Sequence, residues 1–177
     1  MTEKLLTDVE YNYKFIDERI AEAAEKSGRK REDITFLAAT KMVEPEVINH
    51  AISLGLDHIG ENKVQELLSK YDKYNLDNCS LQFIGHLQTN KVKYIIDKVC
   101  MIHSVDSLHL AREIDKRAAQ HGVSMDILIQ VNSAMEESKF GITTGETGQM
   151  INDILEQCPN VRIRGLMCIA PYEDDPE

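Results

Sequence analysis

The sequence has no apolar stretch of the roughly 18 residues that a membrane-spanning helix needs. Its polar start, Met-Thr-Glu-Lys, is not followed by the apolar segment of a signal peptide. Basic residues are also few, 20 against 30 acidic ones, and they are scattered rather than gathered with aromatics. Sequence-independent binding to nucleic acid depends on neutralising phosphates. We therefore predict a cytoplasmic protein that binds neither membranes nor nucleic acid.

Patterns of disulfide and metal chemistry are missing as well. The four cysteines lie far apart and form no C-x-x-C pair, so they are predicted to be reduced and mostly buried. The six histidines show no ligand spacing with cysteines or carboxylates, and we predict no metal site.

What the chain does contain is a regular alternation of short apolar runs and amphipathic segments. With 177 residues and 42% apolar content, it is predicted to form a single domain, 1–177. Strands are predicted at 35–40, 56–59, 80–84, 101–104, 125–131 and 161–169. Helices are predicted at 5–24, 45–55, 64–71, 90–97, 106–122 and 147–157, with Asp106 as a helix cap.

Alternating strands and helices predict a parallel sheet, and two α/β architectures compete for it. An open nucleotide-binding sheet usually has a glycine-rich turn after its first strand, whereas residues 40–43 contain no glycine. We therefore favour a (β/α)8 barrel of the TIM type, with about six of the eight units present and a C-terminal truncation as the expected reason.

A barrel places its active site on the residues that follow each strand. Five of the six predicted strand ends are polar, which favours a site only modestly because turns are rich in such residues anyway. The residues at these ends are Lys41; Glu61 and Asn62; His86, Gln88 and Asn90; Ser104 and Asp106; Asn132 and Ser133; Met167 and Cys168.

Lys41 is the residue that we predict to carry chemistry. It ends the first predicted strand, just before Pro45 opens a helix. A lysine amine there can form an imine with an aldehyde or ketone once it loses its proton, and apolar surroundings or a nearby cation favour that loss. The apolar run before Lys41 is expected to supply the first condition.

Several longer motifs, spread in order over nearly the whole chain, carry a specific resemblance. The motifs are Leu37-Ala-Ala-Thr-Lys-Met-Val43, His58-Ile-Gly-Glu-Asn-Lys-Val-Gln-Glu66, Gln82-Phe-Ile-Gly-His-Leu-Gln-Thr-Asn-Lys91, Ile102-His-Ser-Val-Asp106, Val131-Asn132 with Glu137-Ser-Lys-Phe-Gly-Ile142, and Arg164-Gly-Leu-Met167. Through these motifs the chain resembles the pyridoxal 5′-phosphate (PLP) homeostasis proteins, whose fold is similar to the N-terminal barrel of alanine racemase.

The resemblance implies that Lys41 holds PLP as a Schiff base, and that Asn62, His86, Asn132 and Met167 line the cofactor pocket. It implies a role in PLP homeostasis, with PLP-dependent enzymes as possible recipients, and no catalytic residue of the chain's own. The oligomeric state stays open. The family's Ser/Gly-rich phosphate segment, which follows later strands, has no counterpart in the sequence.

Two enzymatic functions remain as alternatives. One is a PLP-dependent racemase or decarboxylase, although the sequence shows no second domain to supply an acid or base for the substrate α-carbon. The other is a Schiff-base aldolase that acts on a carbonyl substrate without a cofactor.

Overall fold

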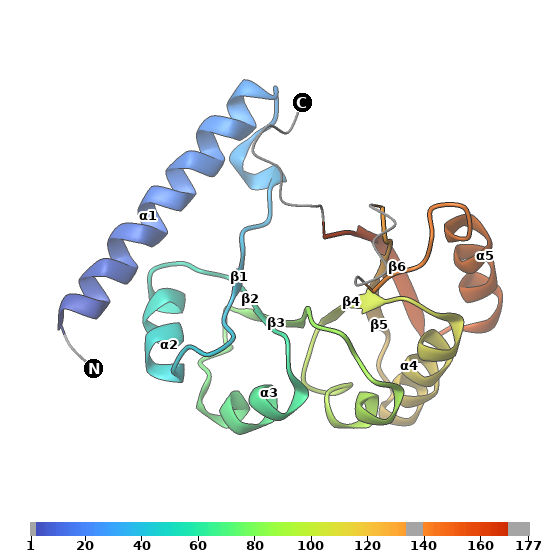
Figure 1. Cartoon of the computed structure of the whole chain (residues 1–177). Helices are drawn as coiled ribbons and strands as arrows, with labels where there is room; N and C mark the ends of the chain where they lie inside the picture. The colour runs from blue at the N-terminus through green and yellow to red at the C-terminus, as the bar shows by residue number, and fades with distance from the viewer. Residues whose placement is uncertain (1–2, 134–139, 170–177) are drawn as a thin grey trace. The chain divides into compact units, whose positions relative to one another are not determined.

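The computed structural model describes residues 3–133 and 140–169 (Figure 1). Part of the motif 137–142 and the polar end of the sequence therefore lie outside the described residues. The chain divides into two compact units: residues 1–61 with 65–81, and residues 62–64 with 82–177. Each unit is described by itself.

The first unit begins with the long helix α1 (Glu3–Lys26), which contacts α2 (Pro45–Ser53) and the short 3-10 helix η1 (Arg31–Asp33). Strand β1 (Leu37–Ala39) pairs in parallel with β2 (His58–Glu61), and Leu37 lies opposite His58 in this pair. Helix α3 (Val64–Lys70) and the 3-10 helix η2 (Tyr71–Lys73) then lead to β3 (Ser80–Phe83). Strand β3 carries the chain from the first unit into the second.

The second unit continues the parallel pattern. After the 3-10 helix η3 (Thr89–Tyr94) come β4 (Met101–Val105), α4 (Leu108–His121), β5 (Met125–Gln130), α5 (Thr147–Gln157) and β6 (Val161–Met167). Strand β4 pairs in parallel with both β3 and β5, and β5 pairs in parallel with β6. Helices α4 and α5 contact each other and β6 (Figure 1).

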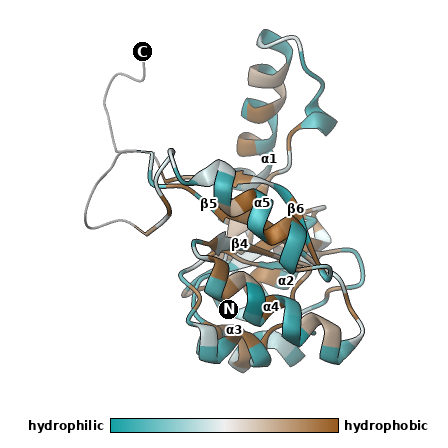
Figure 2. Ribbon diagram, turned by 90° about the vertical axis from the view of Figure 1, so that its right-hand side faces the viewer, coloured by the Kyte–Doolittle hydropathy of each residue, from teal (hydrophilic) through white to brown (hydrophobic). Residues whose placement is uncertain are grey.

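Burial in the second unit follows the periodicity of the sequence. Strand β5 buries Met125, Ile127 and Ile129 at alternate positions, as expected for a strand. Helix α4 buries one face, and its ribbon carries both polar and apolar residues in Figure 2. The residues of that face are Leu110, Ala111, Ile114 and Ala118, which are all at most 2% exposed.

The predicted order of strands and helices is confirmed, with shifts at the boundaries. Strand β1 is shorter than the predicted 35–40 and is not buried as expected, since Leu37 and Ala38 are half-buried and Ala39 is exposed. Ser107, not Asp106, caps α4, because its hydroxyl accepts the Leu110 N–H at 3.3 Å.

Candidate functional site

Lys41 lies in a tight turn directly after β1. The Val43 N–H donates to the Thr40 carbonyl at 3.2 Å, which closes a β-turn over residues 40–43. Met42, the third residue of the turn, has a φ of 62°, the left-handed region that usually requires glycine. Within this turn Lys41 is exposed to solvent. The first unit therefore does not give Lys41 the apolar surroundings that the sequence predicted.

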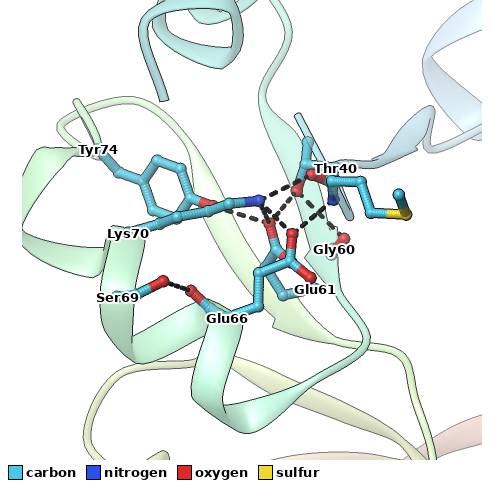
Figure 3. Close-up of polar contacts among 8 residues, drawn as sticks. Thr40, Gly60, Glu61, Glu66, Ser69, Lys70 and Tyr74 are labelled. Carbon is cyan, nitrogen blue, oxygen red and sulfur yellow. Dashed lines mark hydrogen bonds and ion pairs between the residues drawn. The ribbon is translucent and has the colours of Figure 1, made fainter. Parts of the chain in front are cut away.

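A buried carboxylate lies beside this turn, at the end of β2. Glu61 is 0% exposed, and its Oε1 accepts hydrogen bonds from Thr40 Oγ1 at 2.9 Å and from the Tyr74 hydroxyl at 2.8 Å (Figure 3). The Lys70 ammonium is 3.2 Å from the same oxygen. Its second oxygen, Oε2, is buried without a hydrogen-bond partner among the described residues. The lysine therefore supplies the positive charge that this carboxylate needs in a low-dielectric environment.

Lys70 joins this carboxylate to a second one and to the backbone of the turn. Its Nζ donates to the Thr40 carbonyl at 3.2 Å and to Glu66 Oε1 at 2.6 Å (Figure 3). Glu66 Oε1 also accepts the backbone N–H of Met42 at 2.5 Å. We name Thr40, Glu61, Glu66, Lys70 and Tyr74 the Glu61 cluster.

The Tyr74 hydroxyl makes the cluster sensitive to alkaline pH. Burial, together with its hydrogen bond to Glu61 and the charge of that residue, raises the pKa of Tyr74 above its usual value. A pKa that is raised on folding contributes stability below the unfolded pKa of about 10, and the contribution is lost as the pH rises beyond it. We therefore expect the free energy of unfolding to fall above about pH 10.

Urea denaturation from pH 8 to pH 11 measures this effect. Tyr74→Phe is expected to reduce the alkaline dependence, whereas Tyr11→Phe on the exposed face of α1 keeps it. An unchanged alkaline slope in Tyr74→Phe would show that another group is responsible.

In the second unit, Asn62 lies against the loop that follows β3. A Cβ atom added to Gly85 would come within 2.1 Å of the Asn62 carbonyl oxygen, so only glycine permits this approach. Asn62 Oδ1 is buried and has no hydrogen-bond partner among the residues that the structure describes. His86 follows Gly85 directly, and its Nδ1 is 3.7 Å from Asp106 Oδ2.

The His86 ring connects this loop to the segment after β5. It stacks on Phe140, with 3.9 Å between ring centroids and an interplanar angle of 13°. Gly141, with a φ of 124°, approaches Asn132 so closely that an added Cβ would be 2.6 Å from the Asn132 nitrogen. The Asn132 N–H donates to the Ile142 carbonyl at 2.8 Å.

Met167 is the last residue of β6, and it is hydrogen-bonded to the residue that follows β5. Its carbonyl accepts the Val131 N–H at 2.8 Å, next to Asn132. The second unit therefore contains four of the five predicted pocket residues, Asn62, His86, Asn132 and Met167. His86 follows β3, Asn132 follows β5 and Met167 ends β6, whereas Asn62 follows β2 of the first unit. Lys41 belongs to the first unit.

The roles of Lys70, Tyr74 and Phe140 were not predicted from the sequence. A signal for the first two was available, because Glu66, Lys70 and Tyr74 recur every four residues, the spacing of one helix face. Phe140 had no such signal, since its stacking on His86 joins two loops that are far apart in the sequence.

Membrane-spanning helices and metal-binding clusters were both sought among the described residues. Over residues 3–133 and 140–169, no helix is long and apolar enough to cross a membrane. In those same ranges, no three His, Cys, Asp or Glu side chains are grouped so that they could hold a metal ion.

The chain matches a known protein family along most of its length. The sequence profile of the alanine racemase N-terminal domain matches residues 16–177. The PLP homeostasis protein of Aquifex aeolicus is 45% identical over 160 residues, which cover 90% of this chain and 70% of that protein. Two other proteins of the same name are matched over 64% of their length, in Helicobacter pylori, and over 75%, in Vibrio alginolyticus.

Solved structures agree with the sequence profile. A crystal structure of an unknown protein from Bifidobacterium adolescentis has a TM-score of 0.91 and 29% identity, and the match covers 99% of this chain and 74% of the other. PipY of Synechococcus elongatus, solved with PLP bound, has a TM-score of 0.71 and 30% identity, and covers 87% of this chain and 72% of its own.

These matches confirm the predicted α/β fold of the alanine racemase N-terminal type, a partial TIM barrel. The chain belongs to the alanine racemase N-terminal domain family and, within it, to the pyridoxal phosphate homeostasis proteins.

Proposed function

We propose that this chain binds PLP through Lys41 and acts in PLP homeostasis. The observation that carries the proposal is the match to PLP homeostasis proteins over 90% of the chain, together with a PLP-bound structure of the related PipY. Lys41 lies in the motif after β1, in a turn that the Glu61 cluster holds on both sides.

The residues present fit the aldehyde and the polar ring of PLP. When bound, PLP supplies an aldehyde carbon that accepts a primary amine. The exposed Lys41 amine is accessible to such a group. Asn62 Oδ1 is a buried acceptor that no described residue satisfies, and it can receive a hydrogen bond from a ligand hydroxyl. In the same unit, the stacked rings of His86 and Phe140 offer an aromatic surface.

The remaining parts of the proposal rest on the sequence motifs and the relatives. We propose that Asn132 and Met167 line the pocket, that PLP-dependent enzymes receive the cofactor, and that the protein is located in the cytoplasm. Residues 1–177 are proposed to belong to one PLP-binding barrel domain. The chain is proposed to carry PLP without turnover of its own.

Trapping of the cofactor on the protein tests the proposal. Purified chain is mixed with PLP, the absorbance change is recorded, and the product is reduced with borohydride and located by peptide mass spectrometry. We expect the adduct on Lys41, and Lys41→Ala is expected to raise the dissociation constant by more than about ten-fold, because the covalent attachment is lost.

Lys63→Ala is the matched control, since Lys63 is exposed and follows β2 as Lys41 follows β1. It is expected to bind PLP as the wild type does. Equal labelling of wild type and Lys41→Ala would contradict the assignment of Lys41. Racemisation or decarboxylation of added amino acids by the loaded wild type would contradict the carrier function.

A further inference from the structure

We propose that Glu66 and Lys70 are positioning residues that fix the backbone on both sides of Lys41. The inference rests on the proposed function, because it concerns how Lys41 is presented to the cofactor. Figure 3 shows the two side chains converging on the turn from α3. The contacts that carry the inference all lie within the first unit.

The two peptide groups that flank Lys41 are both held by this pair. The Thr40 carbonyl, which belongs to the peptide group before Lys41, accepts from Lys70 Nζ at 3.2 Å. The Met42 N–H, which belongs to the peptide group after Lys41, donates to Glu66 Oε1 at 2.5 Å. With both peptide planes anchored, the direction in which the Lys41 side chain leaves the backbone is fixed.

The turn needs such an anchor because its conformation is unfavourable for its sequence. Met42 adopts a φ of 62° although it has a side chain, a conformation that is unfavourable for any residue other than glycine. Met42 is 88% exposed, so packing of its side chain does not hold the conformation. The charge-assisted hydrogen bond from its N–H to Glu66 offsets the cost.

Lys70 in turn holds Glu66 in place. Its three acceptors, the Thr40 carbonyl, Glu61 Oε1 and Glu66 Oε1, match the three N–H donors of an ammonium group. Lys70 is 9% exposed, and the Glu66 side chain is 19% exposed. Little freedom is therefore left to either group, and the Glu66 carboxylate is directed at the Met42 amide.

Three variants in α3 distinguish a role of Glu66 in positioning the Lys41 turn from a role in the stability of the protein as a whole. Glu66→Ala removes the acceptor of the Met42 N–H, and Glu66→Gln restores an acceptor without charge. Ser69→Ala is the control, because it removes only the hydrogen bond to the Glu66 backbone carbonyl. The first readout is hydrogen exchange of the Met42 amide in the cofactor-free protein, with the Ile59 amide of β2 as internal reference.

We expect Met42 exchange to become about ten-fold faster in Glu66→Ala, less so in Glu66→Gln, and unchanged in Ser69→Ala, while Ile59 exchange stays the same. The second readout is the dissociation constant of PLP and the borohydride-trapped fraction at Lys41. The dissociation constant is expected to rise about ten-fold in Glu66→Ala, with partial recovery in Glu66→Gln.

The two readouts distinguish failure of this inference from failure of the proposed function. Unchanged Met42 exchange in Glu66→Ala overturns the positioning role. Faster Met42 exchange with PLP binding equal to wild type overturns it as well, because the anchored turn then does not matter for binding. Absence of any Lys41 adduct in the wild type overturns the proposed function, whereas Met42 exchange still decides whether Glu66 holds the turn.

Discussion

Replacing Lys70 with methionine is expected to lower the free energy of unfolding by about 3–5 kcal/mol. Methionine fills much of the same space but cannot donate hydrogen bonds. The Glu61 carboxylate, 0% exposed, would then keep its hydrogen bonds from Thr40 and Tyr74 but lose the positive charge 3.2 Å from its Oε1. A buried charge without a partner is among the most destabilising changes in a protein interior. Urea denaturation at neutral pH measures the loss.

Lys73→Met is the matched control, because Lys73 lies in η2 with an exposed side chain, and it is expected to change stability by less than about 0.5 kcal/mol. The double variant Glu61→Gln with Lys70→Met removes both charges and is expected to recover part of the loss. A double variant no more stable than Lys70→Met alone would show that Glu61 is not the source of the penalty.

Gly85→Ala is expected to destabilise the second unit by about 3 kcal/mol. The added Cβ would lie 2.1 Å from the Asn62 carbonyl oxygen and 2.7 Å from its carbonyl carbon. These are backbone atoms, so the clash is relieved only by moving the strand end that carries Asn62. We therefore also expect weaker PLP binding, since Asn62 and His86 would be displaced together.

Gly145→Ala is the control for this substitution, because no atom lies within 4 Å of a Cβ added there. Its stability is expected to stay within about 0.5 kcal/mol of wild type. Thermal unfolding and PLP titration of the two variants give the comparison. If Gly85→Ala were as stable as Gly145→Ala, the close approach to Asn62 would not constrain the loop.

Much of the fold was predictable because it depends on local patterns. The helix over 147–157 and the start of the strand at 125 were predicted at the observed residues, since their apolar periodicity is strong. Boundaries that depend on hydrogen bonding were less accurate. The helix predicted over 90–97 is the 3-10 helix Thr89–Tyr94, a difference that apolar spacing does not reveal.

The candidate site was predictable in part for the same reason. Lys41, Asn62, His86, Asn132 and Met167 could be named because they follow strands within recognisable motifs. The glycines at 85 and 141 could not be assigned to the site, since their role depends on backbones that approach each other in space. The stack of His86 on Phe140 has the same origin.

The sequence by itself determined the alternating α/β architecture, the position of Lys41 after the first strand, and the family. All three depend on residues that are near each other in the chain or on motifs that keep their order. Only the tertiary structure decided that Lys41 lies in a strained turn held by Glu66 and Lys70 over a buried carboxylate. Lys70 and Thr40 are 30 residues apart, and burial arises only when the folded chain brings such segments together.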